Sequence, residues 1–350
     1  MRSFRPIVAN NHLLTIVGNF WPRRLDIGRY PVESKLYHTE PGVQVLVQSQ
    51  RPQGEARGEI VLVHGLEGSG ESGYMVSLSQ AGLEAGFAMH RFHMRTCGGT
   101  AHLCPTLYHG GLTSDLLAFL RQLQKDGRTH VYVAGFSLGG NVVLKLAGEL
   151  GGSADQLIDG VCAVSTPIDL AACARRLGQI ENRIYERRFL RRMCQRLIAT
   201  GRYTEPDFRG IRSIFEIDDK ITAPSFGFHG AEHYYATQSS NQFLDQIRVP
   251  TLVIQAQDDT FIPFEIFHKP IFESSPYLTL LAPERGGHLG FISRDKPRFW
   301  VDGVVIEWIE RQFSAPPDGM APMIRSNRYE VLSSSYPCAP VDSGAESEGI

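Results

Sequence analysis

Apolar residues recur along this chain at two spacings, one typical of buried strands and the other of amphipathic helices. Short apolar runs predict strands, which are expected at 59–65, 87–94, 130–137, 159–165, 251–257 and 277–283. Leucines at helical spacing predict a helix over 114–126, and the last helix is expected over about 297–313. Strands that alternate with helices over such a distance predict an α/β fold, in which a mostly parallel sheet is covered by helices on both faces.

The same alternation predicts how the chain is divided. Residues 1–57 are expected to form an N-terminal extension with edge strands, and residues 58–313 the α/β core. A helix-rich insertion at about 167–249 interrupts the core and is placed to cap the carboxyl edge of the sheet, where α/β proteins bind ligands. Residues 314–350 are rich in Pro, Ser, Gly and acidic residues, and with little to bury they are predicted to be a disordered tail.

Composition and charge argue against several classes of protein. The chain is 42% hydrophobic and 21% charged, as in ordinary globular proteins, and its formal net charge of −2 gives no whole-chain reason to expect nucleic acid or an anionic membrane as a partner. Six cysteines without a repeated spacing are expected to be free thiols in a reducing compartment. The early apolar stretch is broken by Asn10, Asn11 and His12, and no run approaches the roughly 18 apolar residues of a membrane span. A cytoplasmic protein without a transmembrane segment is therefore expected.

One serine lies in a motif that forms a sharp turn between a strand and a helix. The segment GFSLG at 135–139 matches G-x-S-x-G, in which the two glycines leave space for a strained serine. The pentapeptide alone is a weak signal because glycine and serine are common. Here it follows an apolar strand and opens a helix with apolar residues at helical spacing. The context therefore predicts Ser137 as a catalytic nucleophile.

A serine nucleophile needs a base, and the base needs an orienting acid, which lies between the serine and the histidine in this class of fold. Asp258 and Asp259 follow the apolar run 251–257, which places them at the same sheet edge as Ser137. Position within the pattern favours Asp259 as the acid, with Asp258 as its neighbour or a helix cap. Other acids are weighed as alternatives, first Asp169 after the preceding strand and then, less favoured, Asp218 and Asp219 inside the insertion.

The predicted base is His288. It follows the strand expected at 277–283, comes after Gly286-Gly287, and has the required place in the chain order. The glycines allow the backbone to bend so that the imidazole can reach the serine. None of the other eleven histidines combines these features, so His288 is expected to act as general base.

Two backbone N–H groups are expected to bind the oxyanion of an acyl-transfer intermediate. One is that of Leu138, at the start of a helix, and the other that of Leu66, in the loop after the first buried strand. That loop, GLEGSGES, is no phosphate-binding loop, because it lacks G-x-x-x-x-G-K-[ST]. Neither H-E-x-x-H nor paired C-x-x-C is present, so no metal and no other cofactor are expected.

The insertion contains a strongly basic segment. Residues 175–202 hold nine arginines against two glutamates, with apolar residues at helical spacing on the segment 189–197. A solvated basic face over a packed apolar stripe is the favoured interpretation. The alternative is a helix that faces anionic lipid or a phosphate-bearing substrate.

The motifs taken together resemble those of the YheT-like hydrolases, a family of the α/β-hydrolase superfamily. The resemblance runs from about residue 10 to about 312, and its matching stretches include NNHLLTIVGNFWPRR, LVHGLEGSGESGY, MRTCGGTAHLCPTLYHGG, GFSLGGN, PIDLAACARRLG, NRIYERRFL, EIDDKITAPSFGFHGAEHYY, PTLVIQAQDDTFIP and GGHLGF. It implies an α/β-hydrolase fold and hydrolysis of carboxylic esters by a triad of Ser137, Asp259 and His288. Animal relatives are membrane-anchored and include phospholipase-type enzymes, whereas no N-terminal anchor is expected for this chain, which has MRTCGG where many relatives have an arginine-glycine pair.

The sequence therefore predicts a serine esterase acting without cofactor on a small-molecule ester, with lipid acyl esters among the candidate substrates. Hydrolysis is favoured over acyl transfer, because LGFISRD after His288 lacks an H-x-x-x-x-D signature. The alternatives are an acyltransferase and a non-catalytic binding protein that keeps the fold. Peripheral contact with a membrane is an alternative that the sequence neither predicts nor excludes.

Overall fold

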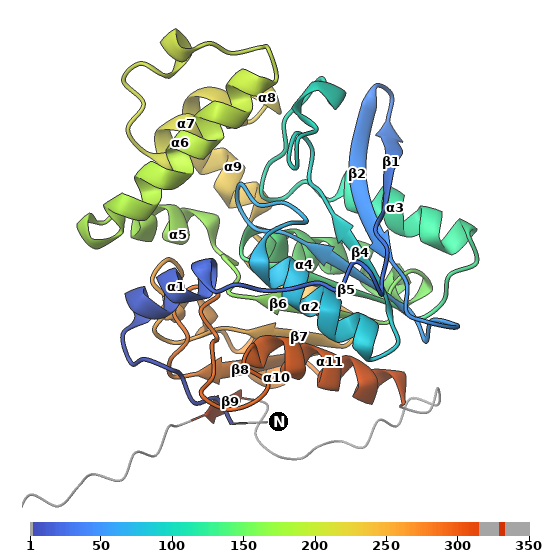
Figure 1. The fold of residues 1–350 in the computed structure, drawn as a ribbon. Helices are drawn as coiled ribbons and strands as arrows, with labels where there is room; N and C mark the ends of the chain where they lie inside the picture. Colours follow the sequence, from blue (N-terminus) through green and yellow to red (C-terminus); the bar gives the residue numbers. More distant parts are fainter. Residues whose placement is uncertain (1–2, 315–328, 333–350) are drawn as a thin grey trace, which may run out of the picture.

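The computed structural model describes residues 3–314 and 329–332, and its centre is a nine-stranded sheet in the order β1-β2-β4-β3-β5-β6-β7-β8-β9 (Figure 1). Pairing is antiparallel between β1 and β2 and between β2 and β4, and parallel from β4 onward. The strands are β1 (Glu33–Glu40), β2 (Val43–Gln50), β3 (Glu59–Val63), β4 (Ala88–Phe92), β5 (Val131–Phe136), β6 (Gly160–Val164), β7 (Thr251–Ile254), β8 (Leu278–Pro283) and β9 (Tyr329–Leu332).

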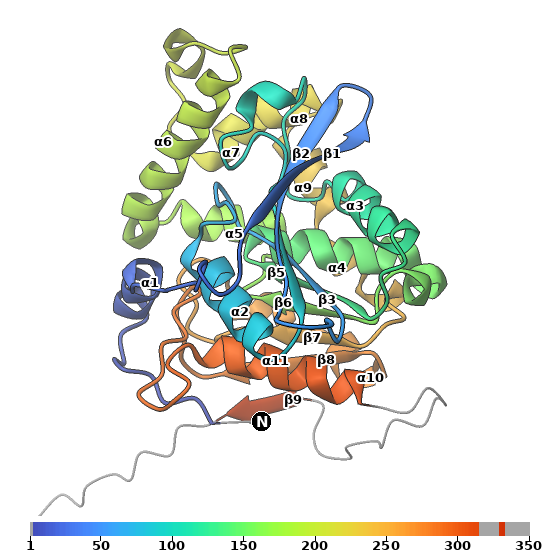
Figure 2. The same ribbon diagram turned by 45° about the vertical axis from the view of Figure 1, so that its right-hand side comes forward.

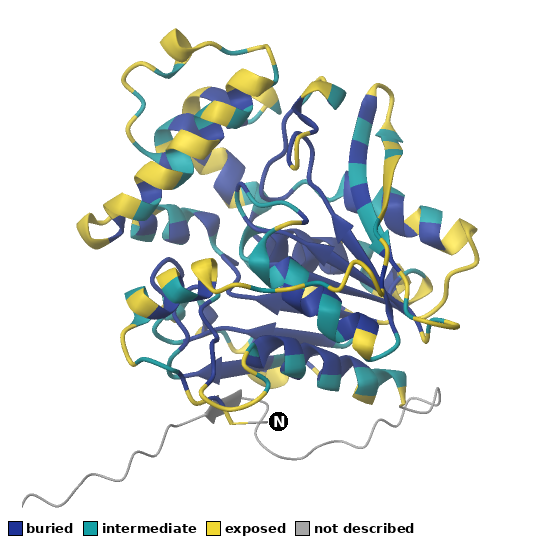
Figure 3. Cartoon of the chain, viewed as in Figure 1, coloured by how far each residue is buried: buried dark blue, intermediate teal, exposed yellow. Residues whose placement is uncertain are grey.

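Helices cover both faces of this sheet. On β5, Val131 and Val133 pack in one apolar core with helices α3 and α4, whereas Tyr132 and Phe136 pack in a second core with α2 and α11. The central strands are buried throughout and read as continuous apolar runs, as expected for parallel strands covered on both sides (Figure 3). The predicted α/β-hydrolase fold is confirmed. The four helices that cover the two faces of the sheet are α2 (Gly73–Glu84), α3 (Ser114–Lys125), α4 (Leu138–Leu150) and α11 (Trp300–Phe313).

A group of helices between β6 and β7 lies over the carboxyl ends of the parallel strands (Figures 1 and 2). They fall in the range expected for the insertion and comprise α5 (Leu170–Leu177), α6 (Arg183–Ala199), α7 (Ile214–Ile217), the π-helix η5 (Asp218–Thr222), α8 (Ala223–Ser225) and α9 (Ala231–Gln238). The remaining helix after β7 is α10 (Ile271–Ser274). Short 3₁₀ turns are η1 (Ala101–Leu103), η2 (Gly151–Gln156), η3 (Ile180–Asn182), η4 (Glu205–Phe208), η6 (Ser240–Gln242), η7 (Leu244–Gln246) and η8 (Phe264–Phe267).

Helix α1 and strand β9 come in addition to the elements predicted above from the sequence. The N-terminal region forms helix α1 (Asn11–Phe20) before the two edge strands. Of the tail predicted to be disordered, the structure describes Ser314 and strand β9, which pairs with β8, and the rest of that prediction lies outside the described residues. No helix in the described part of the chain has both the length and the apolar character that crossing a bilayer requires.

Candidate active site

Ser137 occupies a strained turn between β5 and α4. Its φ of 51° and ψ of −122° are unusual for a residue with a side chain. The flanking glycines make this turn possible, because a Cβ on Gly135 would lie 2.3 Å from the Gly139 carbonyl oxygen. A Cβ on Gly139 would lie 2.4 Å from the carbonyl oxygen of Val63. The turn therefore holds the Ser137 side chain at the carboxyl edge of the sheet.

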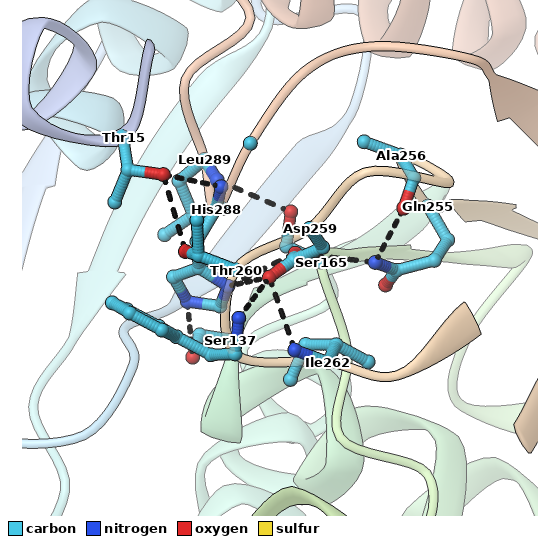
Figure 4. A network of polar contacts seen from close by, with 12 residues as sticks. Thr15, Ser137, Ser165, Gln255, Ala256, Asp259, Thr260, Ile262, His288 and Leu289 are labelled. Carbon is cyan, nitrogen blue, oxygen red and sulfur yellow. Dashed lines mark hydrogen bonds and ion pairs between the residues drawn. The ribbon is translucent and has the colours of Figure 1, made fainter. Parts of the chain in front are cut away.

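The structure brings the three predicted catalytic side chains into one line (Figure 4). The Nε2 atom of His288 lies 3.0 Å from Ser137 Oγ, and its Nδ1 lies 3.1 Å from each carboxylate oxygen of Asp259. A carboxylate beside Nδ1 favours the tautomer that carries its proton there. Nε2 is then free to accept the hydroxyl proton of Ser137. Both His288 and Asp259 are buried.

Asp259 is held as an acceptor by its surroundings. Its Oδ1 accepts hydrogen bonds from the backbone N–H groups of Phe261 at 2.8 Å and Ile262 at 3.1 Å, and its Oδ2 accepts one from the Gln255 side chain at 3.1 Å. Such bonds stabilise the ionised carboxylate and fix its orientation. Asp259 is thus presented to the imidazole of His288 in one geometry.

The other candidate acids have different partners. Asp258 Oδ1 accepts a hydrogen bond from the N–H of Gly287 at 2.9 Å, so it holds the loop that carries His288 rather than the imidazole itself. Burial raises the pKa of Asp258 above its usual value. The remaining three are placed as follows: Asp169 caps α5 through Ala172 N–H, Asp218 accepts a hydrogen bond from Tyr235 Oη, and Asp219 accepts one from Ala231 N–H.

Helix α1 supports the His288 loop, a role that no sequence motif indicates. Thr15 Oγ1 accepts a hydrogen bond from the backbone N–H of His288 at 2.9 Å and donates one to the Asn11 carbonyl at 2.8 Å. The two segments lie so close that a Cβ on Gly18 would be 2.7 Å from Gly290 Cα. A local signal for the helix was present, because Asn10 precedes an apolar run and its side chain caps Leu13 N–H. No local signal connects Thr15 with His288.

Replacing Thr15 by valine is expected to lower kcat about tenfold, because a displaced imidazole loses its alignment with Ser137. The buried N–H of His288 would also lose its acceptor, which we expect to lower the free energy of unfolding by about 1–3 kcal/mol. Hydrolysis of a soluble ester and denaturant unfolding measure the two effects. Thr15→Ser keeps the hydroxyl and should retain most of the activity. A folded Thr15→Val protein with wild-type kcat would contradict a supporting role for α1.

The two predicted oxyanion donors lie beside Ser137. Leu138 is the first residue of α4, Leu66 lies in the loop after β3, and both line the same pocket as Ser137 and His288. Within the described residues, neither of the two N–H groups donates to another protein atom. A Cβ on the adjacent Gly65 would lie 2.9 Å from Ser137 Cβ, so this loop runs against the nucleophile.

A buried ion pair joins that loop to helix α6. Glu67, which has a φ of 53°, accepts two hydrogen bonds from Arg196 Nε at 2.8 and 3.1 Å. Arg196 also donates to Thr96 Oγ1 at 2.9 Å, and its guanidinium lies 4.7 Å from the centre of the Tyr108 ring. Burial opposes the charge on Arg196, but the Glu67 carboxylate with its neighbours outweighs burial and raises the pKa of Arg196. We refer to this contact as the Glu67–Arg196 pair.

Two pockets meet at Ser137. The first lies beneath the helices of residues 170–238 and has a volume of about 780 Å³, which includes solvent space at its open mouth. Its lining is largely apolar and includes Leu170, Leu177, Phe189, Met193, Ile214 and Tyr234. The second, about 1310 Å³ counted in the same way, lies between α1, α2 and α6, and its lining includes Ile16, Phe20, Tyr74, Arg188 and Arg192. Both share Ser137 and His288. There is room for one part of a substrate on each side of the serine.

Two buried ionisable side chains that line the first pocket, His109 and Asp218, differ in charge at pH 7. Burial lowers the pKa of His109 to about 3, so its imidazole is neutral at pH 7, and it packs against Phe226 and Tyr234. Burial raises the pKa of Asp218 to about 6, so this carboxyl group is still mostly ionised at pH 7. Among the described residues, no three His, Cys, Asp or Glu side chains are grouped so as to hold a metal ion.

A strained serine turn, an aligned imidazole and a parallel sheet capped by helices together define the α/β hydrolases. A model of the alpha/beta hydrolase family matches residues 60–302, and the chain belongs to that family. Its sequence is 32% identical to "Putative esterase YheT" of Escherichia coli (strain K12) over 327 residues, which cover 90% of this chain and 93% of the relative. The resemblance to the YheT-like hydrolases is thereby confirmed.

More distant proteins share the sequence pattern or the fold. The monoacylglycerol lipase of Saccharomyces cerevisiae (strain ATCC 204508 / S288c) is 30% identical over 264 residues, which cover 70% of this chain and 57% of the lipase. Among solved structures, the Pyrococcus furiosus esterase Pf2001 superposes with a TM-score of 0.56 at 17% identity, covering 83% of this chain and 98% of that protein. At this identity the likeness shows the fold alone.

Proposed function

We propose that this protein is a serine hydrolase that cleaves carboxylic esters through an acyl-serine intermediate. The observation that carries the proposal is the chain of contacts from Asp259 through His288 to Ser137 at the junction of two pockets. The names of its relatives, an esterase and a monoacylglycerol lipase, support ester hydrolysis as the reaction class.

In the proposed mechanism, Ser137 Oγ attacks the carbonyl carbon of the ester while His288 Nε2 accepts the hydroxyl proton. The N–H groups of Leu66 and Leu138 donate hydrogen bonds to the oxyanion of the tetrahedral intermediate. The intermediate collapses, the alcohol leaves with the proton from His288, and the acyl group remains on Ser137. Water, deprotonated by His288, then attacks the acyl carbon, and His288 returns the proton to Ser137 Oγ as the bond to the serine breaks and the carboxylic acid leaves. Asp259 stays ionised throughout and stabilises the imidazolium.

The two pockets suggest how the ester is oriented. We assign the acyl group to the first pocket, because its lining is mostly apolar and apolar surface favours a hydrocarbon chain. We assign the alcohol part to the second pocket, whose lining is more polar and includes Arg188 and Arg192. Lipid acyl esters are thus among the proposed substrates. We also propose a cytoplasmic location, supported by five described cysteines that are all free thiols.

A fluorophosphonate probe tests the proposed function, because it reacts with a serine that is activated by a neighbouring base. Wild-type protein is expected to be labelled at Ser137, and Ser137→Ala is expected to remain unlabelled. The same two proteins are then assayed with esters from acetyl to long-chain acyl groups. A folded wild-type protein that neither reacts with the probe nor releases acid from any ester would contradict the proposal and favour a binding protein with the hydrolase fold.

A further inference from the structure

The second pocket opens beside an exposed apolar face of α1. Leu13, Ile16 and Phe20 are exposed by 50%, 42% and 64%, and their spacing of three and four residues puts them on one side of the helix. The opposite side of α1 contains the buried Leu14 and Thr15, which face the core and the His288 loop. Helix α1 therefore supports the active site with one face and presents large apolar side chains to solvent with the other.

The turn η3 and the start of α6 continue this apolar surface. Ile180 and Ile184 are each 80% exposed. Helix α1 lies beside this end of α6 in both ribbon views (Figures 1 and 2), where the Tyr185 hydroxyl is 3.2 Å from His12 Nδ1. We call the exposed apolar residues on α1, on the turn η3 and at the start of α6 the mouth rim, and its members are Leu13, Ile16, Phe20, Ile180 and Ile184.

Positive charge lies on the α6 side of the mouth rim. The arginines exposed on the first half of α6 are Arg183, Arg187, Arg188, Arg191 and Arg192, and the guanidinium of Arg188 lies 5.1 Å from the centre of the Phe20 ring. The two acidic residues of this stretch offset little of that charge, because Glu181 is paired with Arg176 at 2.8 Å and Glu186 is buried. A local excess of positive charge is thus set against a whole-chain net charge of −2.

Large exposed apolar residues next to arginines match the chemistry of one kind of partner. At a lipid surface, apolar side chains enter the boundary between headgroups and acyl chains, while arginines bind anionic headgroups. Isolated exposed apolar residues are common, but these five lie on neighbouring elements beside a pocket that Ile16 and Phe20 line, and such a group is typical of an interaction site. We propose that the mouth rim and its arginines form a docking surface for membranes that contain anionic lipid. This inference rests on the proposed esterase function: a docked protein would hold its second pocket against the membrane that contains the lipid ester.

Vesicle co-sedimentation of the full chain tests this docking surface. Wild-type protein is expected to bind vesicles that contain phosphatidylglycerol, to bind pure phosphatidylcholine vesicles much more weakly, and to be released by salt. The variant Arg187→Gln/Arg191→Gln is expected to bind phosphatidylglycerol vesicles about 25-fold more weakly, since each arginine near the surface contributes roughly fivefold. For Ile180→Glu/Ile184→Glu, at least a tenfold loss is expected.

These four side chains are exposed and lie outside both pockets, so the variants should fold and hydrolyse a soluble ester as the wild type does. Leu36→Glu is the matched control, since Leu36 is an exposed apolar residue on β1, away from the mouth, and its replacement should leave vesicle binding unchanged. Equal binding of wild type to both vesicle types, or unchanged binding of the Ile180→Glu/Ile184→Glu variant, would overturn the proposal. So would a wild-type dimer that dissociates in that variant, because the rim would then be covered by a second copy.

The outcomes for docking and for catalysis are separable. A wild-type protein that neither reacts with the probe nor hydrolyses a soluble ester would contradict the esterase proposal. Binding of that protein to anionic vesicles would still support the docking surface. Normal hydrolysis of a soluble ester together with absent vesicle binding would contradict the docking surface alone.

Discussion

Asp259→Asn is expected to hydrolyse a soluble ester about 10⁴-fold more slowly than the wild type, and Ser137→Ala about 10⁶-fold more slowly. In Asp259→Asn, the amide would donate a hydrogen bond to Nδ1 of His288 and so favour the tautomer with its proton on Nε2. That nitrogen could then no longer accept the proton of Ser137. Side-chain size is nearly unchanged, so the loss should appear in kcat while the free energy of unfolding changes little by comparison.

Asp258→Asn is the matched control for Asp259→Asn. Asp258 contacts the N–H of Gly287 rather than the imidazole, and an asparagine oxygen can still accept that hydrogen bond. We therefore expect kcat to fall by less than about tenfold, since only the position of the loop is affected. If Asp258→Asn were the more damaging of the two substitutions, the orienting acid would be Asp258 and the proposed triad would have to be revised.

Arg196→Met is expected to lower the free energy of unfolding by about 3 kcal/mol or more, because the Glu67 carboxylate would be left buried without its cation. Urea unfolding followed by circular dichroism measures this loss. The same substitution should slow labelling by the fluorophosphonate probe, since Glu67 adjoins Leu66 and the pair fixes the loop of the proposed oxyanion donor. The physical cause is the free-energy cost of removing a charge from water, which the attraction within an ion pair offsets and which a single buried charge has nothing to offset.

Two further variants separate the Glu67–Arg196 pair from a general effect of arginine loss. Glu67→Gln/Arg196→Met removes both charges, so it should recover much of the stability that Arg196→Met loses. Arg191→Gln removes an exposed arginine of the same helix and should change the free energy of unfolding by less than about 0.5 kcal/mol. Equal stability of Arg196→Met and Arg191→Gln would show that the pair contributes nothing to the fold.

The choice among acids illustrates how far sequence reasoning extends. The run ending at residue 257 predicts a buried strand, and parallel strands end at a common edge, so the sequence alone places both Asp258 and Asp259 near Ser137. The two differ by one position, and a turn decides which carboxylate reaches His288. That turn is closed by the N–H groups of Phe261 and Ile262, a contact that no spacing rule specifies.

The sequence by itself determined the alternation of strands and helices, the turn at Ser137, and the chain order that brings Ser137 and His288 to one edge of the sheet. These features depend on local periodicity and on glycine positions, which are visible within short windows. Only the tertiary structure decided that Thr15 supports His288 across 273 positions and that Glu67 pairs with Arg196 across 129. Such contacts arise when packing removes water from polar groups that must then find partners, and the identity of those partners depends on how whole elements are placed.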